Sequence, residues 1–421
     1  MTMRDDPESL QVDNLPAARR SMRIAVVTET YPPEVNGVAI TLAEVIRRLH
    51  LRNHDIQLIR PRQGGEGVGL SPARQPTGFH EVLMRGMPIP RYTQLRMGVP
   101  SKRALVRLWS VQRPDVVHIA TEGPLGWSAL QAAISLQLPV SSDFRTNFHA
   151  YSRHYGIRWL RKPIVGYLRK FHNLSQRTTV PTEALARELS AAGFERLVVV
   201  ARGIDAQRFS PEHRSLALRQ QWGLSPDDLG VLYVGRLAPE KNLDQLVLSF
   251  EAIERANPRA RLVLVGDGPM RASLQLRMPR AVFCGQRTGM ELAQHYASAD
   301  LFLFPSKTET FGNVTVEAMA SGLAVVAYGD GAALQLIEHG RNGLCVPVTD
   351  DAGFLVQALQ LALDLSACRR LGSAARATAL QLDWETIVDR LEGVLREVAD
   401  PTRTEPVGRK WFGQGRSAPV G

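Results

Sequence analysis

The sequence predicts an α/β protein of two doubly wound parallel domains that face each other across a cleft. Short apolar strand patterns alternate with helix patterns from Arg23 onward, and this alternation is typical of a parallel sheet covered by helices. The alternation pauses at 201–211, which has no periodicity, and restarts at Gly230. The chain has 421 residues, of which 44% are hydrophobic, so two domains can each have a core.

The first half opens with a strand, a loop and a helix, the first unit of a nucleotide-type sheet. Residues 23–28 form the strand, 29–37 the loop and 38–51 the helix. The loop lacks Gly-x-Gly-x-x-Gly, so no dinucleotide fingerprint is predicted. The later elements expected in this half are strands at 115–119, 139–142, 178–181 and 197–200, and helices at 125–136 and 184–192.

The second half repeats the alternation after an interdomain linker at 201–211. Strands are expected at 230–234, 261–265, 282–284, 301–305, 324–327 and 343–346, and helices at 351–363, 366–380 and 384–398 close the fold. The predicted divisions are a disordered leader (1–21), an N-terminal domain (22–200), a C-terminal domain (201–385), a final helix (386–400) and a disordered tail (401–421).

The positive charge is concentrated in one block of the chain. The net charge is +10, but 78–177 holds 15 Lys and Arg against 4 Asp and Glu, a net of +11, so the rest sums to −1. A localised excess predicts a localised anionic partner. No nucleic-acid module is recognisable, and an anionic membrane surface or lipid fits better.

Part of that block forms a basic amphipathic pattern at 157–171. Its apolar residues recur at helical spacing, with Arg and Lys on the other faces, and Pro163 either kinks the helix or marks its start. Such a helix can lie in a membrane headgroup plane. The alternative is an ordinary domain helix with a solvated outer face.

Compartment signals favour the cytoplasm. The first 20 residues lack an apolar signal-peptide core, and no run of about 18 apolar residues exists. Three scattered cysteines without Cys-x-x-Cys exclude a disulfide scaffold and a thiolate zinc site, and suit a reducing compartment. We therefore expect a cytoplasmic protein on the inner face of the cell membrane.

Two carboxylates, Glu309 and Glu317, flank the start of a predicted helix after the strand at 301–305. Carboxylates suit sugar hydroxyls, and backbone N–H groups at Phe311, Gly312 and Asn313 should point at a ligand. The alternative is that these acids only interact favourably with the dipole of the helix at its N-terminus.

Two cations, Arg236 and Lys241, follow the strand at 230–234 and should reach the same sheet edge. An Arg and a Lys beside a helix start suit a diphosphate, and fixed cations stabilise the charge that gathers on it as it leaves. Such a clamp replaces a divalent ion, and the chain has no Asp-x-Asp, so no metal or other cofactor is expected. The alternative is an ordinary solvated Arg and Lys.

Three glycines and a histidine also lie next to predicted strand ends or helix starts. Gly266 and Gly268, in a Gly-Asp-Gly-Pro turn, are expected either to line a nucleotide pocket or only to form the turn. Gly37 precedes the first helix, where it lets backbone approach a ligand closely or simply forms a helix-entry turn. His118 ends the strand at 115–119, where it contacts a bound sugar or is structural.

These motifs together resemble the retaining GT-B glycosyltransferases of family 4, which include phosphatidylinositol mannosyltransferases and plant sulfoquinovosyl-diacylglycerol synthase. The likeness runs from about Met22 to Val398. The resemblance rests on three motifs: Glu-x7-Glu at 309–317, Gly-Arg-x-x-x-Glu-Lys at 235–241 and Gly-Asp-Gly-Pro at 266–269. The resemblance implies two facing Rossmann-like domains, with the last helix crossing back to the first.

The resemblance also implies roles for single residues. Arg236 and Lys241 would hold the diphosphate, Glu317 the ribose hydroxyls, and Glu309 the donor sugar. With His118 near the reacting carbon, the expected catalytic set is His118, Glu309, Arg236 and Lys241.

The remaining donor contacts come from glycines and from backbone. Phe311 and Gly312 would hold the donor sugar together with Glu309, and Gly37 would lie against the donor phosphate. Gly266 and Gly268 complete the expected donor-binding set.

One departure from the family falls in the loop that usually faces the acceptor. Family members often carry a Tyr-His-Thr-like stretch there, whereas this chain has Asp143-Phe-Arg-Thr-Asn-Phe-His149, so that Arg145 replaces the histidine. We expect Arg145 and His149 to bind the acceptor. The positive charge of Arg145 would pair with an anionic acceptor headgroup or with an acidic donor sugar.

The expected activity is transfer of a hexose from GDP-mannose or a UDP-hexose to a hydroxyl of a lipid-linked acceptor, with retention, at the cytoplasmic membrane face. Two rivals remain at this point. One is a soluble GT-B glucan or disaccharide synthase or sugar-nucleotide epimerase. The other is a non-catalytic sugar-nucleotide-binding scaffold on the membrane.

Overall fold

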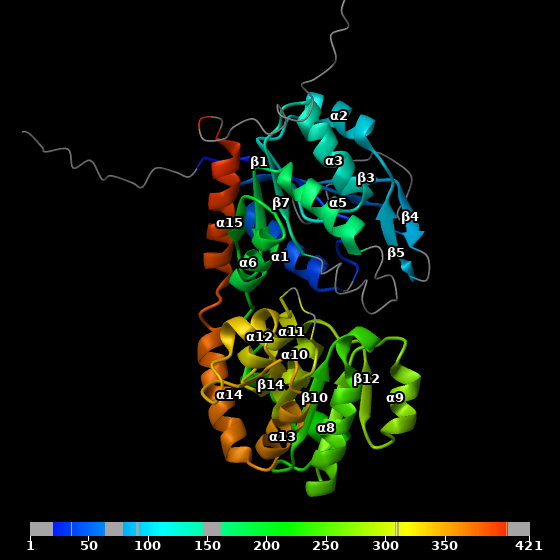
Figure 1. The fold of residues 1–421 in the computed structure, drawn as a ribbon, viewed down its shortest axis with the longest axis vertical. Coiled ribbons are helices and arrows are strands. Elements are labelled where there is room, and N and C mark those ends of the chain that lie inside the picture. Colours follow the sequence, from blue (N-terminus) through cyan, green and yellow to red (C-terminus); the bar gives the residue numbers. More distant parts are fainter. Residues whose placement is uncertain are drawn as a thin grey trace, which may run out of the picture.

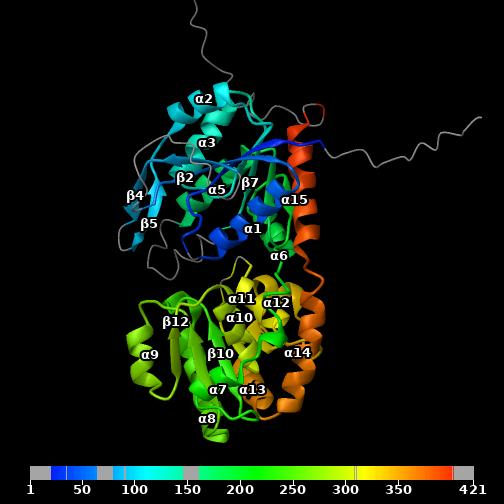
Figure 2. The same ribbon diagram turned by 180° about the vertical axis from the view of Figure 1, so that it is seen from behind.

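The computed structural model describes residues 20–34, 36–63, 79–89, 92–145, 161–307, 309, 311–400 and 402. The expected leader and tail lie outside the described residues, apart from 20, 21 and 402, and so does His149. Figure 1 shows two α/β units arranged one above the other along the long axis of the molecule, and Figure 2 shows the same arrangement from behind.

The N-terminal sheet has seven parallel strands in the order β3-β2-β1-β6-β7-β8-β9. Its order changes direction between β1 and β6, and ligands of open α/β sheets bind outside the carboxyl ends of the strands at such a point. The strands are β1 (Arg23–Val27), β2 (Asp55–Pro61), β3 (His80–Met84), β6 (Val116–Ile119), β7 (Val140–Asp143), β8 (Arg177–Val180) and β9 (Leu197–Val199).

The C-terminal sheet has six parallel strands in the order β12-β11-β10-β13-β14-β15 and changes direction between β10 and β13. Its central strands are buried along their whole length, as a sheet covered on both faces requires. The strands are β10 (Gly230–Val234), β11 (Arg261–Val265), β12 (Val282–Gly285), β13 (Leu301–Phe304), β14 (Ala324–Tyr328) and β15 (Leu344–Val346).

Helices cover both sheets. In the N-terminal unit they are α1 (Gly37–Leu51), α2 (Lys102–Val111), α3 (Pro124–Ser135), α5 (Arg161–Asn173) and α6 (Glu183–Ala191). In the C-terminal unit they are α7 (Leu216–Gln221), α8 (Leu243–Ala256), α9 (Arg271–Arg277), α10 (Gly289–Ser298), α11 (Asn313–Ala320), α12 (Gly331–Leu336), α13 (Asp351–Ala362) and α14 (Leu365–Ala379), followed by α15 (Trp384–Ala399).

The predicted architecture of two parallel doubly wound sheets is confirmed, and most expected elements lie within one or two residues of their observed ends. The expected elements did not include β2, β3, α2, α7 and a separate antiparallel hairpin of β4 (Gly86–Ile89) and β5 (Tyr92–Gly98). Helix α2 buries only Leu105 and Trp109, one turn apart, so its apolar stripe is too narrow to predict a helix.

The basic amphipathic segment is described only from residue 161. The described part of α5 runs from Arg161 to Asn173 and includes Pro163. The choice between a kink and a helix start at this proline depends on residues before 161, which lie outside the described residues. Leu168 and Phe171 are buried, whereas Lys162, Arg169 and Lys170 are exposed.

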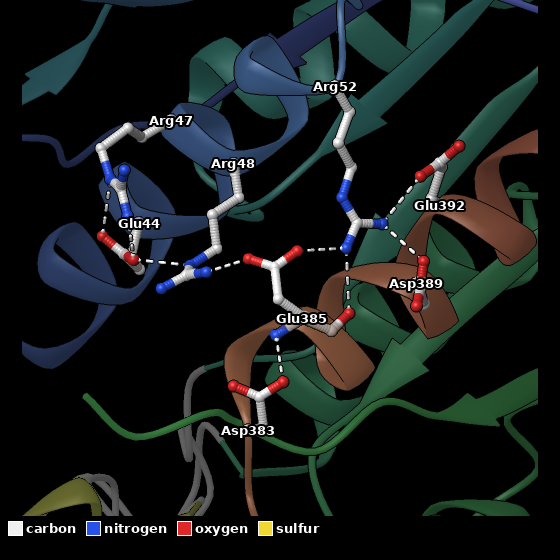
Figure 3. Close-up of polar contacts among 8 residues, drawn as sticks. All are labelled: Glu44, Arg47, Arg48, Arg52, Asp383, Glu385, Asp389 and Glu392. Atoms are coloured by element: carbon white, nitrogen blue, oxygen red, sulfur yellow. Dashed lines mark hydrogen bonds and ion pairs between the residues drawn. The ribbon is translucent and has the colours of Figure 1, made fainter. Parts of the chain in front are cut away.

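Helix α15 returns from the C-terminal unit and packs along α1 of the N-terminal unit, as predicted. Figure 3 shows the polar side of this contact: Arg52 donates to Glu385 (2.6 Å), Asp389 (2.7 Å) and Glu392 (2.9 Å), and Arg48 also pairs with Glu385. The apolar side forms one core with the N-terminal sheet; α15 contributes Val388, Leu391, Leu395 and Val398. Arg52 is 20% exposed and Glu392 only 2%, so apolar burial and partly buried ion pairs together hold the helix in place.

Candidate functional site

The loops that leave the carboxyl ends of β10, β11 and β13 carry most of the predicted ligand-binding residues. Arg236 and Lys241 follow β10, Gly266 follows β11, and Glu309 follows β13. β10 lies between β11 and β13 in the sheet, so these loops are neighbours at one edge, beside the point where the strand order reverses.

Each of the two cations has a carboxylate beside it. Lys241 Nζ donates to Glu309 Oε1, and the two side chains are 19% and 14% exposed. Arg236 Nη1 approaches Glu240 Oε1 at 3.4 Å, with Glu240 buried and Arg236 about one-third exposed. The structure therefore joins the two motifs that the sequence analysis singled out through Lys241 and Glu309.

The loop before α11 is fastened to the start of α12. The backbone N–H of Glu309 donates to Asp330 Oδ2 (2.6 Å), and the N–H of Ala332 donates to the carbonyl of Phe311 (2.5 Å). Gly312 is the N-cap of α11 and has φ 89°, a left-handed conformation that favours glycine. Within the described part of the chain, the N–H groups of Gly312 and Asn313 have no acceptor, so they can bind a ligand at the helix N-terminus.

Glu317 lies inside α11 and pairs with a tyrosine. Tyr296 donates its hydroxyl to Glu317 Oε2 at 2.8 Å. Burial raises the pKa of Glu317 to about 7, against the smaller lowering effects of Tyr296 and Arg208. The carboxyl therefore changes charge near neutral pH.

Gly266 and Gly268 allow two backbone loops to touch. A Cβ at Gly266 would overlap the carbonyl oxygen of Gly235, and one at Gly268 would overlap that of Leu237. Hydrogen bonds from Gly235 N to Val265 O (3.0 Å) and from Leu237 N to Asp267 O join the loops. This packing accounts for both glycines without a ligand, and it positions Arg236, which lies between Gly235 and Leu237.

His118 is buried on β6 of the N-terminal sheet. Its Nδ1 lies 2.9 Å from Ser141 Oγ, and burial lowers the pKa of His118 to about 4, so the ring is neutral at physiological pH. Its Nε2 is buried and has no hydrogen-bond partner among the described residues. An unsatisfied buried nitrogen of this kind suits a ligand hydroxyl.

Arg145 is buried beside His118 and is incompletely paired. Its Nε donates to Asp143 Oδ2, while its Nη1 is buried without a partner in the described part of the structure. The charge of Asp143 raises the pKa of His118, and the charge of Arg145 lowers it. Arg145 therefore presents an unused N–H donor close to His118.

Arg202 brings a second cation to Arg145 and was missed by the sequence analysis. Burial and then the charge of Arg145 lower the pKa of Arg202 to about 10. The Arg202 guanidinium also contacts Asn313 (3.3 Å) and lies 5.6 Å from the ring centre of Phe311, so it links the two units. The residue lies in a segment without periodicity, which we interpreted as linker, and no sequence signal marked it.

The two units also meet at the starts of α1 and α11. Asn36 caps α1 through the N–H of Ala39 (2.8 Å). Asn313 Nδ2 donates to Thr41 Oγ1 at 3.2 Å and would lie 3.5 Å from a Cβ at Gly37. Gly37 therefore lies at the interface, directly opposite the start of α11.

The described residues contain neither a cluster of metal ligands nor a membrane-spanning helix. In that part of the chain, no group of three or more His, Cys, Asp or Glu side chains is placed to hold a metal ion. Likewise, none of the described helices combines the length and the apolar character needed to cross a bilayer.

Comparisons with known proteins assign both halves of the chain to glycosyltransferase family models. Residues 228–364 match the family model "Glycosyl transferases group 1", and residues 35–208 match "Glycosyltransferase Family 4". The chain is 37% identical over 373 residues to a GDP-mannose-dependent alpha-mannosyltransferase of Mycobacterium tuberculosis, covering 88% of this chain and 96% of that protein.

A second M. tuberculosis relative is the GDP-mannose-dependent alpha-(1-6)-phosphatidylinositol monomannoside mannosyltransferase. It is 26% identical over 393 residues, covering 89% of this chain and 98% of the relative. Among solved structures, sucrose-phosphate synthase from Thermosynechococcus elongatus superposes with a TM-score of 0.72 over 90% of this chain and 99% of the synthase. At 19% identity that likeness concerns the fold, and it agrees with the expected GT-B architecture.

Proposed function

This chain belongs to glycosyltransferase family 4, and we propose that it transfers mannose from GDP-mannose, with retention, to a hydroxyl of a lipid-linked acceptor. The observation that carries the proposal is the junction of Lys241 with Glu309 beside Arg236, at the reversal point of the C-terminal sheet. There a diphosphate meets two cations and a sugar meets a carboxylate.

Three supports point to the donor and the acceptor. The relative with 37% identity is named as GDP-mannose-dependent, which favours GDP-mannose over a UDP-hexose. The phosphatidylinositol monomannoside mannosyltransferase is named for a lipid acceptor. The basic block at 78–177 suits an anionic membrane surface.

In the proposed reaction, the bond between the anomeric carbon and the diphosphate oxygen breaks, and the diphosphate leaves with the electron pair. Arg236, Lys241 and the N–H groups at the start of α11 stabilise that charge without reorganising. The acceptor oxygen attacks from the same face, and its proton passes to the leaving phosphate oxygen. Glu309 holds sugar hydroxyls, neutral His118 donates or accepts one hydrogen bond through Nε2, and no metal is required.

The stereochemistry is tested by NMR of the product formed from GDP-α-mannose. The proposal requires an α-linked product, and a β-linkage would exclude same-face attack. Thermal shifts with a panel of nucleotide sugars test the donor, because a bound donor raises the melting temperature by mass action. GDP-mannose should give the largest shift.

Residence at the cytoplasmic membrane face is tested by co-sedimentation with liposomes. Binding should need anionic lipid and should weaken as salt rises, because the attraction is electrostatic. If binding depends neither on lipid charge nor on salt, the basic block at 78–177 does not attract the protein to the membrane.

The affinity for GDP should rise with pH between about 6 and 8 because of Glu317. Ribose hydroxyls donate to the ionised carboxylate, and the pKa of Glu317 is raised to about 7, so the accepting form becomes dominant as pH increases through 7. The affinity is measured by calorimetry. Glu317→Gln should bind GDP more weakly and lose this pH dependence; an unchanged pH profile in the variant would assign the effect to another group.

Arg145→Gln should raise the KM for an anionic acceptor, phosphatidylinositol, by roughly tenfold or more, because it removes a charged donor from a buried site. The KM for neutral monoglucosyldiacylglycerol should stay within about twofold of wild type. Steady-state kinetics with both lipids in mixed micelles measure the split. Equal KM changes for both acceptors, or a higher KM for the donor alone, would remove Arg145 from acceptor recognition.

A further inference from the structure

A cavity of about 460 Å³ lies between α5 and α6, apart from the donor contacts described above. Its volume is in the range of small-molecule sites. Phe144, Leu168, Leu189 and Phe194 line it, and each of them is buried. The chemistry of these walls suits a hydrocarbon chain rather than a sugar or a nucleotide.

Charged side chains lie around this apolar cavity. Lys162 and Arg169 contribute two cations from α5, and Glu188 contributes one anion from α6. All three residues are exposed, and Arg169 also donates to the carbonyl of Ala192 at 3.3 Å. An apolar cavity with a net positive rim fits an amphiphile that has an anionic or polar head.

The cavity lies near the proposed transfer site. Helix α6 faces α12 of the other unit in both ribbon views (Figures 1 and 2). Burial is the main cause that raises the pKa of Asp330, and the negative charge of the nearby Glu188 raises it further. Asp330 in turn accepts from the N–H of Glu309 at 2.6 Å. One rim residue of the cavity thus neighbours the loop that would hold the donor sugar.

We propose that this cavity holds one acyl chain of the lipid acceptor while the acceptor headgroup reaches the donor between the two units. This assignment rests on the proposed function. The chain packs against Phe144, Leu168 and Phe194, and the cations at Lys162 and Arg169 face the headgroup region. Acceptor recognition then has a hydrocarbon component in addition to the contacts of Arg145.

Gly166 offers a way to fill the cavity without disturbing the fold. It lines the cavity within α5, and a Cβ at this position would meet no atom within 4 Å. Gly166→Phe should therefore occupy the space with a ring, and Gly166→Ala should leave most of it open. Gly393 is the matched control, because it is also a helical glycine with no atom within 4 Å of its Cβ, but lies on α15.

The first experiment measures binding of dodecanoate, below its micelle concentration, by calorimetry. Wild type, Gly166→Ala and Gly393→Phe should bind with similar affinity, and Gly166→Phe should bind at least about tenfold more weakly. Replacing Lys162 and Arg169 by Gln should weaken binding by roughly fivefold. Equal binding by Gly166→Phe and wild type would overturn the cavity assignment.

The second experiment asks whether the bound chain belongs to the acceptor or to bulk lipid. Transfer from GDP-mannose is measured to dodecyl and to butyl β-D-glucoside. Gly166→Phe should lose the wild-type preference for the dodecyl acceptor, by about tenfold in kcat/KM, and keep its rate on the butyl one. Gly393→Phe should retain both rates.

The two experiments separate the possible failures. If Gly166→Phe loses dodecanoate but keeps the dodecyl preference, the cavity holds a chain of bulk lipid and the acceptor assignment is overturned. If it loses both acceptors equally, the cavity serves the fold and the proposal is also overturned. If wild type glycosylates neither glucoside nor phosphatidylinositol, the lipid-acceptor function fails, while the dodecanoate result still decides the cavity.

Discussion

Replacing Arg236 and Lys241 together by alanine should reduce kcat by about a thousandfold or more. In the proposed reaction each cation stabilises the charge that develops on the leaving diphosphate. Removing one such preorganised donor commonly costs about 10² to 10³ in rate. Rates are measured with saturating donor, because the loss should fall on kcat as well as on donor affinity. The single variants should each lose a large part of this rate.

The control for this experiment is an arginine outside the site. Arg341 is 75% exposed in the same unit and pairs with Glu338 on the surface, so Arg341→Ala should keep the wild-type rate. Melting temperatures of all variants establish that they are folded. A folded Arg236→Ala, Lys241→Ala double variant that retains more than about one-tenth of the wild-type rate would show that the leaving group is stabilised elsewhere.

Gly266→Ala should lower the stability of the C-terminal unit by about 3 kcal/mol or more. The residue has φ 137°, which an L side chain rarely adopts, and its Cβ would overlap the rigid carbonyl of Gly235. The melting temperature, measured by calorimetry, should fall by roughly 6 to 12 °C. Donor affinity should fall as well, because the displaced loop carries Arg236.

Gly340→Ala is the control that separates backbone strain at a positive φ from steric overlap of the new Cβ. Gly340 also has a left-handed φ of 80°, but its Cβ would meet no atom within 4 Å. This variant should lose only about 1 kcal/mol and leave donor affinity unchanged. If Gly266→Ala costs no more than Gly340→Ala, the two loops do not depend on the close approach at Gly266.

The sequence was sufficient for the fold and for the proximity of Lys241 and Glu309. Strand patterns followed by Arg236, Lys241 and Glu309 placed these residues at one sheet edge, because carboxyl ends of parallel strands share an edge. The structure then joined Lys241 to Glu309 directly. Local pattern and sheet topology carry this part of the inference, and neither requires knowledge of side-chain packing.

What remained hidden depends on contacts between distant segments. Arg202 lies in an aperiodic stretch and becomes notable only beside Arg145 and Asn313. Gly266 reads as a turn glycine in the sequence, whereas the structure shows a backbone that almost touches Gly235. The roles assigned to single site residues, the placement of His149 and the exact domain limits stay predictions.

The central claim is that Arg236 and Lys241 recognise a pyrophosphate. Its most direct test compares the dissociation constants of GDP and GMP by calorimetry in wild type and in the double alanine variant. Wild type should prefer GDP by at least about tenfold, and the variant should bind GDP and GMP almost equally. A variant that keeps the full wild-type preference for GDP would contradict the claim.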